Sequence, residues 1–300
     1  MTASAGGDPA VVYITGWGRS GSTVLNRIVA REGVLGLGEV RRLWRRGIGE
    51  RQDCSCGKAW DACDVWSHVV RAIAQTSGKS AEECAKEFDR AAFTAGKLAT
   101  VPGGLRLGDA SKRYVAALRE LYLSAAEASG TTIVVDSSKD PTHALLARRT
   151  GLPVSVVHLV RDPRAVVWSH RRRKSPPAGV VATTTPTRPA AFVAARWLVR
   201  NAFIDARVRP DLRLRYEDLI SDPDEAIRRI FLSVGREVPE GRAGSEHVIA
   251  GNPSRFERGP LLLKVDDEWT RAQPAAQQLL TSAITAPLLG KYGYPYKVRV

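Results

Sequence analysis

The sequence predicts an α/β fold in three layers, with a parallel β-sheet in the middle and helices on both faces. Three apolar runs rich in β-branched residues are typical of buried parallel strands, and a fourth run alternates arginines with apolar residues. A polar or glycine-containing turn and then a helical pattern follow each run, which is the order that βαβ units require. The runs are Val11–Thr15, Thr131–Val135, Val154–Val160 and Leu212–Tyr216.

The first run leads directly into a glycine-rich turn that opens a helix. From Gly16 to Gly21 this turn has the GxxxxG spacing of a phosphate-binding loop, in which backbone N–H groups and the helix dipole hold a phosphate. In a nucleotide triphosphatase the next residue is a lysine that reaches the outer phosphates. This chain has Ser22 there, and the nearest cation is Arg19 inside the loop. We therefore expect a P-loop-like fold whose ligand is not magnesium-bound ATP.

A second group of anion-binding side chains follows the third run. Arg161 comes at the end of the strand, Pro163 suits the first turn of a helix, and Ser169 lies about two turns further on. A phosphate at the start of this helix would accept bonds from both Arg161 and Ser169. Arg173 is one turn beyond Ser169 on the same face. Taken by itself, this run also fits a basic helix face in contact with water.

The rest of the chain predicts one domain with insertions. A long insert at about residues 40–130 separates the first two runs and has helical stretches at Ala81–Ala99 and Tyr114–Ala128. The segment Ser175–Pro189 carries four prolines and four threonines, which predicts an extended or mobile loop. No linker composition interrupts residues 1–300, so we expect a single domain.

The two anion-binding motifs together resemble those of the sulfotransferases that use 3′-phosphoadenosine 5′-phosphosulfate (PAPS), and most closely the protein-tyrosine, Golgi-type and bacterial branch. In that family a loop like RSGST at 19–23 holds the 5′-phosphosulfate, and an Arg…Ser pair like that in RDPRAVVWS at 161–169 holds the 3′-phosphate. GEVR at 38–41 resembles the segment that carries a catalytic glutamate. SKDP at 138–141 and RYEDL at 215–219 resemble the family's lysine-bearing and adenine-contacting segments.

The resemblance implies a role for each matching residue. Glu39 would remove the proton of an acceptor hydroxyl, and Lys139 would stabilise charge beside the leaving oxygen. Taken singly, Glu39 also fits a carboxylate at a helix start, and Lys139 fits an ordinary ion pair at a helix end. Residues 252–260 and 266–269 occupy the place of the family's C-terminal strap over the donor. The implied donor-binding residues are Arg19, Ser20, Gly21, Ser22, Thr23, Arg161, Ser169, Arg173, Tyr216, Asn252, Ser254 and Arg255.

The chemistry of sulfuryl transfer is consistent with a loop that lacks lysine. The transferred group carries one negative charge, so no divalent ion is needed beside it, and we expect no metal requirement. The desulfated product would be 3′-phosphoadenosine 5′-phosphate (PAP). A hydroxyl of a glycan, a lipid or a specialised metabolite would accept the sulfate. We expect the insert, including Leu43, Trp44 and the cysteine segment at 54–63, to form the acceptor pocket, with residues 175–189 as a lid.

Charge and single residues leave two other functions open. Arginine supplies most of the 45 basic residues, and the formal net charge of +14 at pH 7 favours an anionic ligand. Asp136 ends the second run, where a small-molecule kinase would have a magnesium ligand, although Ser22 replaces the lysine of such an enzyme. The RRxxRR run at 41–46 would suit a nucleic-acid-binding protein. Aromatic residues rarely alternate with basic ones here and no nucleic-acid-binding motif is evident, so we expect no nucleic-acid partner.

Three of the four cysteines, Cys54, Cys56 and Cys63, lie close together in the sequence. With His68 they would offer four ligands to zinc, although Cys-x-Cys followed by six residues and Cys is an uncommon zinc spacing. A local disulfide or reduced cysteines that pack inside the protein fit the sequence as well.

The sequence also bears on where the protein works. No secretory signal is visible, and no apolar run has the length that crossing a bilayer requires, so we expect a cytoplasmic protein without stable membrane insertion. The usage of arginine and alanine with little lysine is typical of bacterial proteins. The oligomeric state stays open.

Overall fold

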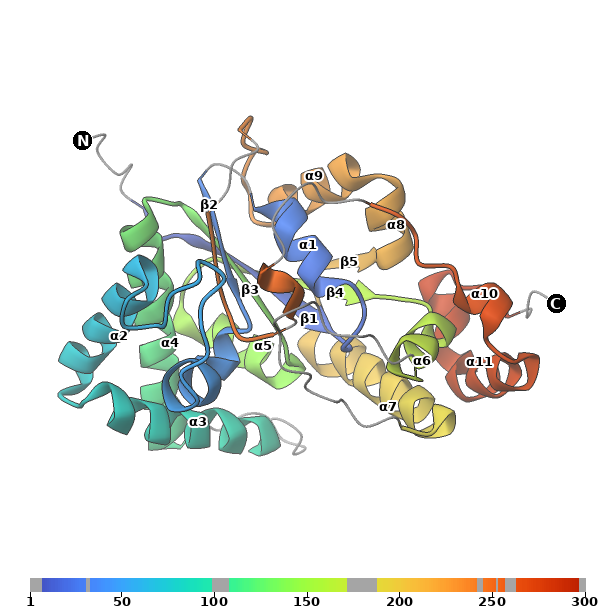
Figure 1. The fold of residues 1–300 in the computed structure, drawn as a ribbon, viewed down its shortest axis with the longest axis horizontal. Helices are drawn as coiled ribbons and strands as arrows, with labels where there is room; N and C mark the ends of the chain where they lie inside the picture. Colours follow the sequence, from blue (N-terminus) through green and yellow to red (C-terminus); the bar gives the residue numbers. More distant parts are fainter. Residues whose placement is uncertain are drawn as a thin grey trace.

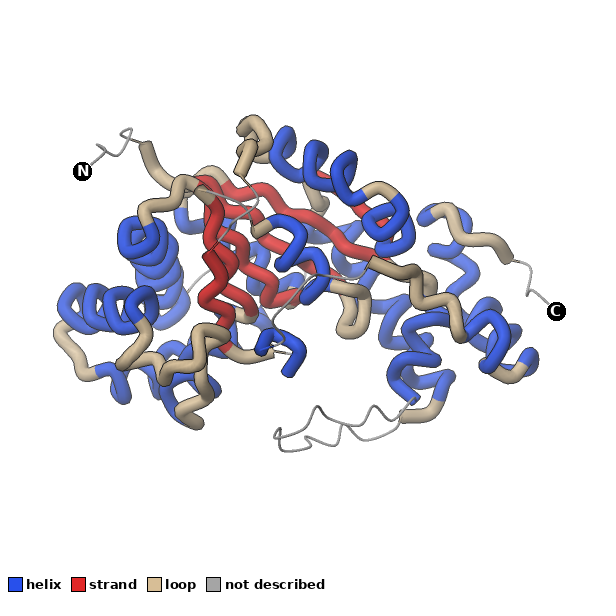
Figure 2. The backbone as a smooth tube through the Cα atoms, turned by 45° about the horizontal axis from the view of Figure 1, so that its top comes forward, coloured by secondary structure: helices blue, strands red, loops and turns tan. Residues whose placement is uncertain are grey.

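The centre of the fold is a parallel β-sheet with helices on both faces (Figures 1 and 2). The computed structural model describes residues 7–30, 33–98, 108–171, 188–241, 245–251, 253–256 and 263–296. Within these residues the sheet has six strands in the order β5-β4-β1-β3-β2-β6, and all neighbours are parallel. The strands are β1 (Ala10–Gly16), β2 (Val34–Gly38), β3 (Ile133–Lys139), β4 (Val154–Val160), β5 (Leu212–Arg215) and β6 (Ser245–Ile249).

Helices form the two outer layers. Helices α2, α3, α4 and α5 contribute to the apolar core on one face, and α1, α8 and α9 contribute to the core on the other face. A third core joins the end of β4 to α6, α7 and α11. The helices are α1 (Ser22–Val29), α2 (Asp64–Ser77), α3 (Ala81–Leu98), α4 (Asp109–Ser129), α5 (Pro141–Ala147), α6 (Pro163–Arg171), α7 (Ala190–Phe203), α8 (Tyr216–Ser221), α9 (Pro223–Ser233), α10 (Trp269–Ala272) and α11 (Ala275–Leu289).

Short helical turns complete the described chain. Those with 3₁₀ geometry are η1 (Val40–Arg42), η3 (Arg148–Thr150), η5 (Pro253–Phe256) and η6 (Gly290–Tyr292). Two turns have π-helical geometry, η2 (Leu43–Gly49) and η4 (Ile204–Val208).

Strand β1 shows why these runs are continuously apolar. Val11 and Tyr13 lie in the core with α2 to α5, whereas Val12 and Ile14 lie in the core with α1 and α9. Because successive side chains of a strand point to opposite faces, a strand covered on both faces needs apolar residues at every position. The predicted α/β class and the four predicted strands are confirmed, with β3 beginning two residues later and continuing to Lys139.

Two strands were missed from the sequence, and both lie on one side of the sheet. Strand β2, VLGLG, contains two glycines, which are poor strand formers. Gly36 is needed there because a Cβ at this position would lie 2.8 Å from Nδ2 of Asn26 on α1. Strand β6, SEHVI, is short and has polar residues in its first half, as is common at a sheet edge.

The predicted insert is largely helical, as expected. Helices α3 and α4 confirm the two predicted helical stretches, and α2 adds a third. The insert begins after β2, so the strand that precedes it is β2 rather than β1. Of the expected loop at 175–189, only residues 188 and 189 lie within the described residues. No helix among the described residues is both long and apolar enough to span a bilayer.

Candidate active site

The carboxyl ends of four neighbouring strands bring the candidate residues to one edge of the sheet. Glu39 follows β2, Lys139 ends β3, Gly16 ends β1, and Arg161 follows β4. These four strands are adjacent in the order β4-β1-β3-β2. Ligands of open parallel sheets bind beyond this edge, so the sheet itself gathers the two anion-binding motifs and the candidate catalytic residues.

Glu39 and Lys139 form an ion pair at this edge. Nζ of Lys139 lies 2.5 Å from Oε1 of Glu39, and Nε of Arg42 pairs with the other carboxylate oxygen. The Glu39 side chain is only 10% exposed. Burial opposes the ionisation of Glu39, but the charges of Lys139 and Arg42 outweigh it and lower the pKa of Glu39. The carboxylate is therefore ionised at neutral pH and able to accept a proton.

The backbone around this pair is held in unusual conformations. Lys139 has a φ of 64°, which is uncommon for a residue with a side chain. Gly38 has a φ of 76°, and a Cβ there would lie 2.5 Å from Cγ1 of Val248 on β6. The N–H of Glu39 donates to the carbonyl of Ile249, 3.2 Å away. Strand β6 thus fixes the position from which the Glu39 side chain extends.

The predicted phosphate loop connects β1 to α1. Arg19 and Gly21 both have left-handed backbone conformations, with φ values of 71° and 90°. Gly21 is the N-cap of α1 and has no side chain with which to satisfy the first N–H groups of the helix. The Ser20 hydroxyl is buried, and among the described residues it has no hydrogen-bond partner. Unsatisfied donors at a helix N-terminus suit an anion.

Arg161 lies buried beside this loop. Its guanidinium donates to the Arg19 carbonyl at 3.2 Å, forms an ion pair with Asp266 at 3.2 Å, and lies 4.4 Å from the centre of the Tyr216 ring. Nε of Arg19 donates to the Ser169 hydroxyl at 3.1 Å. The two anion-binding motifs, which are distant in sequence, therefore form one continuous cluster.

A cleft runs from the phosphate loop past the ion pair to β6. Its opposite wall is β6 and the turn after it, so the edge strand faces Glu39 across the cleft. Arg255 lines this cleft, whereas Arg161 lies on the other side of the loop. The lining includes Ser22, Thr23, Glu39, Lys139, Glu246 and Arg255.

Comparison with known proteins identifies the family to which this arrangement belongs. A model of the sulfotransferase family matches residues 9–240, from β1 to just beyond α9. The chain belongs to the sulfotransferase family. The resemblance found in the sequence is thereby confirmed. No curated protein sequence matches the chain.

Two solved structures share the fold of this sulfotransferase. A sulfotransferase domain from the olefin synthase of Synechococcus PCC 7002 is 18% identical, with a TM-score of 0.50, over 97% of this chain and 98% of that domain. A sulfotransferase domain from the curacin biosynthetic pathway is 17% identical, with a TM-score of 0.53, over 96% of this chain and 99% of that domain. At these identities the likeness extends to the fold alone.

Membership of the sulfotransferase family implies PAPS as donor, and the residues present fit it. The unpartnered Ser20 hydroxyl and the N-terminus of α1 suit the phosphosulfate end. Arg161 is a buried cation that would suit the 3′-phosphate, and the aromatic face of Tyr216 lies beside it. These residues would hold the donor, and Lys139 lies in the same cleft as the first residues of α1.

The structure brings most of the predicted site residues together. Arg173 and Asn252 lie outside the described residues, and no side-chain placement is described for Ser254. Arg255 lies on the cleft side with Glu39 rather than beside Arg161. Two residues were missed: Arg42, whose i,i+3 spacing from Glu39 indicates an ion pair, and Asp266, which lies in the strap segment already noted.

The prediction that Leu43 and Trp44 line the acceptor pocket is wrong. Leu43 and Trp44 are 0% and 1% exposed and belong to the core with α2 to α5. Trp44 packs against Phe88, with the ring centres 4.9 Å apart. Their side chains are therefore structural, because the π-helical turn η2 directs them inward rather than towards the cleft.

Gly21 gives the first test of the loop geometry. A Cβ at Gly21 would lie 2.4 Å from Cδ2 of Tyr216, and the φ of 90° is unfavourable for any side chain. We expect Gly21→Ala to weaken PAP binding about tenfold or more, because the loop and Tyr216 must move apart. Titration calorimetry with PAP measures this. Gly18→Ala is the matched control, since a Cβ there meets nothing within 4 Å. Equal losses in both variants would contradict the assignment.

Proposed function

We propose that this sulfotransferase moves the sulfuryl group of PAPS to a hydroxyl of a glycan, lipid or specialised metabolite and releases PAP. The observation that carries the proposal is the contact between Glu39 and Lys139, 2.5 Å apart, in a cleft that also contains the first residues of α1. A base and a cation in the same cleft as a phosphate-binding loop are what transfer to a hydroxyl requires.

Binding of the donor orients the group that is transferred. Backbone N–H groups of Ser20 to Thr23 bind the phosphosulfate, and Arg161 and Ser169 bind the 3′-phosphate. Tyr216 packs against the loop at Gly21 and lies beside Arg161, which supports a role for its ring in contact with the adenine. Two separated anion sites hold the donor in a single orientation, and this positioning supplies part of the rate enhancement.

Glu39 and Lys139 carry the transfer step. Glu39 accepts the proton of the acceptor hydroxyl. The oxygen of that hydroxyl forms a bond to sulfur while the bond between sulfur and the phosphate oxygen of the donor breaks. Lys139 donates a hydrogen bond to that leaving oxygen and stabilises its charge. Lys139 lowers the pKa of Glu39 in the structure. When the Lys139 ammonium moves towards the leaving oxygen, the proton affinity of Glu39 rises during the step in which Glu39 accepts the proton of the hydroxyl.

The surroundings of Asp136 disfavour the kinase alternative. Asp136 is fully buried and accepts hydrogen bonds from the Tyr122 hydroxyl at 2.7 Å and the Ser138 N–H at 2.8 Å. Burial raises the pKa of Asp136 to about 6, as expected for a carboxyl without a cation beside it. This side chain supports β3 from inside the protein and does not face the cleft as a magnesium ligand would.

The basic run at 41–46 gives little support to nucleic-acid binding. Arg41 pairs with Asp140 at 3.2 Å, Arg42 pairs with Glu39, and Arg45 pairs with Glu50 at 3.4 Å. Three of its arginines are thus neutralised by carboxylates of the same chain. A phosphate backbone would have to compete with these pairs.

Ligand preference separates the sulfotransferase from the kinase. We expect PAP to bind with the same affinity whether or not magnesium is added, because arginines and N–H groups neutralise its phosphates. Mg·ATP should bind at least tenfold more weakly, since the loop has no lysine for its outer phosphates. Titration calorimetry with both ligands measures this. Tight binding of ATP that depends on magnesium would contradict the proposal.

We further propose that residues 1–300 act as one catalytic domain and that the reaction takes place in the cytoplasm. Strands from Ala10 to Ile249 share one sheet, and α11 packs in the core with α6 and α7, which supports a single unit. None of the four cysteines is paired in a disulfide, as is usual in a reducing compartment.

A further inference from the structure

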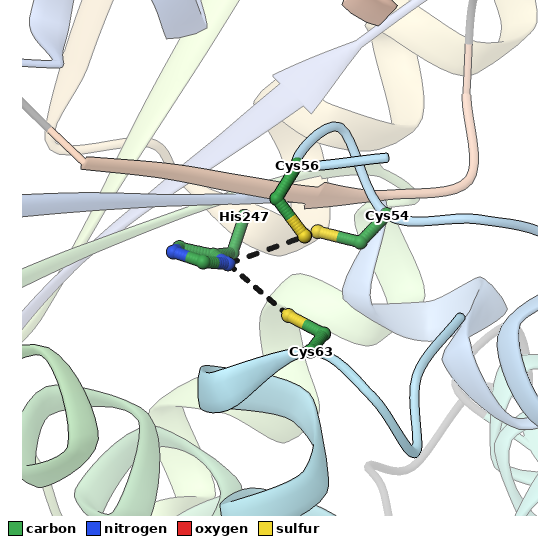
Figure 3. A group of neighbouring side chains, drawn as sticks. All are labelled: Cys54, Cys56, Cys63 and His247. Carbon is green, nitrogen blue, oxygen red and sulfur yellow. Dashed lines mark hydrogen bonds between the residues drawn. The ribbon is translucent and has the colours of Figure 1, made fainter. Parts of the chain in front are cut away.

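Four side chains with sulfur or imidazole donors meet beside strand β6, outside the catalytic pair. Cys54 and Cys56 come from a loop before α2, Cys63 is the N-cap of α2, and His247 comes from β6. Their donor atoms all lie within 4.8 Å of one another. Figure 3 shows the three sulfur atoms and one ring nitrogen of His247 directed towards a common space.

We propose that Cys54, Cys56, Cys63 and His247 bind one zinc ion. Nδ1 of His247 lies 3.1 Å from Sγ of Cys63 and 3.8 Å from Sγ of Cys54. In a tetrahedral site with Zn–S bonds of about 2.3 Å and Zn–N bonds of about 2.0 Å, the ligand atoms lie about 3.5–3.8 Å apart. Small side-chain adjustments therefore bring this group to zinc geometry. Three thiolates and one imidazole form a common structural zinc set.

The local backbone is built to present these ligands. The N–H of Cys54 donates to the Lys58 carbonyl and the N–H of Gly57 to the Cys54 carbonyl, each at 2.9 Å, which closes a tight turn around Cys56. Gly57 has a φ of 86°, which favours glycine. Cys63 lies at the N-terminus of α2, where the helix dipole stabilises a thiolate. Zinc binds the thiolate form of cysteine.

The fourth ligand corrects the expectation from the sequence. His68 is not a member of the group; it lies on α2 and its Nε2 is 3.4 Å from a carboxylate oxygen of Glu127. His247, which is 184 residues from Cys63, takes its place. The fourth cysteine, Cys84, lies apart on α3, where its sulfur is 3.2 Å from the Ser77 hydroxyl.

Zinc explains the group better than the two alternatives do. A disulfide would join two of the cysteines. It would not explain why the third thiol and the His247 nitrogen point into the same space. Packing of reduced cysteines accounts for buried thiols, and Cys54 and Cys63 are both 0% exposed. It does not account for an imidazole nitrogen directed into the same space.

The ion would fasten the insert to the wall of the active-site cleft. Ser55, between two of the ligands, donates its N–H to the Val248 carbonyl at 3.0 Å, and its hydroxyl accepts from the Val248 N–H at 2.9 Å. Trp66 of α2 donates to the His247 carbonyl at 2.8 Å. Val248 packs over Gly38, and the neighbouring Ile249 binds the Glu39 N–H. Zinc would therefore hold β6 in the position that orients Glu39.

This role is structural, and it is separate from the expectation that the reaction itself needs no metal. With four protein ligands the ion has no open position for substrate or water. Glu246 of β6 lines the cleft, and the adjacent His247 points to the opposite face of the strand, where it contacts Cys63 and Cys54. Loss of the ion should destabilise the fold near β6 rather than remove a reacting group.

The metal content of the purified protein tests the proposal. Protein made without a polyhistidine tag and washed with a weak chelator should contain about one zinc ion per chain by plasma mass spectrometry. Cys63→Ser and His247→Ala should each reduce the content to near zero. Cys84→Ser and His68→Ala are the matched controls, because these residues are of the same types but lie outside the group, and they should keep the ion.

Cobalt gives a second measurement that does not depend on how well a variant folds. Wild-type protein stripped of zinc and refilled with Co²⁺ should show the intense visible absorption of tetrahedral cobalt with thiolate ligands, and zinc should displace it. Stripping should also lower the midpoint of thermal unfolding, and zinc should restore it.

Definite results would overturn the proposal. The first is a wild-type protein that contains no zinc and gives no tetrahedral cobalt spectrum. The second is a disulfide between two of these cysteines in protein purified from the cytoplasm. The third is equal zinc content in Cys63→Ser and Cys84→Ser. None of these measurements uses PAPS or an acceptor, so they stand apart from the test of sulfuryl transfer.

Discussion

Replacing Glu39 with glutamine is expected to lower the turnover number about 10²-fold or more while PAP binds as tightly as it does to the wild type. Glutamine has nearly the same shape but accepts no proton at neutral pH, so the acceptor hydroxyl loses its base. The donor site does not include this side chain. Transfer of labelled sulfate from PAPS to an identified acceptor measures turnover, and calorimetry measures PAP binding.

A control and a pH profile sharpen this prediction. Glu50→Gln is the matched control, because Glu50 is exposed and pairs with Arg45 outside the cleft; its turnover should stay near that of the wild type. Lys139 and Arg42 hold the pKa of Glu39 below its ordinary value of 4.5, so the wild type should keep its base down to that pH. Full activity of Glu39→Gln would remove Glu39 from the mechanism.

Replacing Arg161 with alanine is expected to weaken PAP binding by about 2–3 kcal/mol, which is the usual loss for a buried hydrogen bond to a charged group. The guanidinium lies beside Arg19 and Tyr216 and is only 5% exposed, so little water can replace it. Adenosine 5′-phosphosulfate lacks the 3′-phosphate and should lose far less affinity. Calorimetric titration of the variant with both ligands measures the difference.

The comparison of the two ligands is the test of the 3′-phosphate site. Equal losses for PAP and adenosine 5′-phosphosulfate would show that Arg161 supports the loop in general and does not bind that phosphate. Arg149→Ala is the matched control, because Arg149 is exposed and precedes β4, at the amino ends of the strands and away from the candidate site. It should bind both ligands as the wild type does. A thermal unfolding curve confirms that each variant is folded.

Structural features that depend on a short stretch of chain were predicted well. The apolar run before Gly16, the glycine spacing up to Gly21 and the nine residues from Arg161 to Ser169 all lie within single βα units. In such units the strand, the turn and the helix follow from adjacent residues, so periodicity and turn chemistry suffice. Four of the six described strands were predictable for this reason, and so were the positions of the glycine-rich turn and of Arg161 at the carboxyl ends of their strands.

Features that depend on neighbouring strands were harder to predict. Strand β2 has the sequence VLGLG. Its glycines are required because Asn26 of α1 and Val248 of β6 pack so closely that they leave no room for a Cβ. Leu43 and Trp44 follow Glu39 closely, yet the turn that contains them points inward. Local propensity contains no information about such contacts, because they depend on which elements become neighbours in space.

The sequence by itself determined that the first strand leads into a turn with the glycine spacing of a phosphate-binding loop and with Ser22 in place of the lysine of a kinase, because backbone geometry at Gly16 and Gly21 is a local property. Only the tertiary structure decided that Glu39 meets Lys139, 100 residues away, and that His247 joins Cys63 across 184 residues. The first contact arises because β3 and β2 are neighbours in the sheet, and the second because β6 lies beside the insert that carries Cys63. Strand order depends on long-range packing, and no local pattern encodes it.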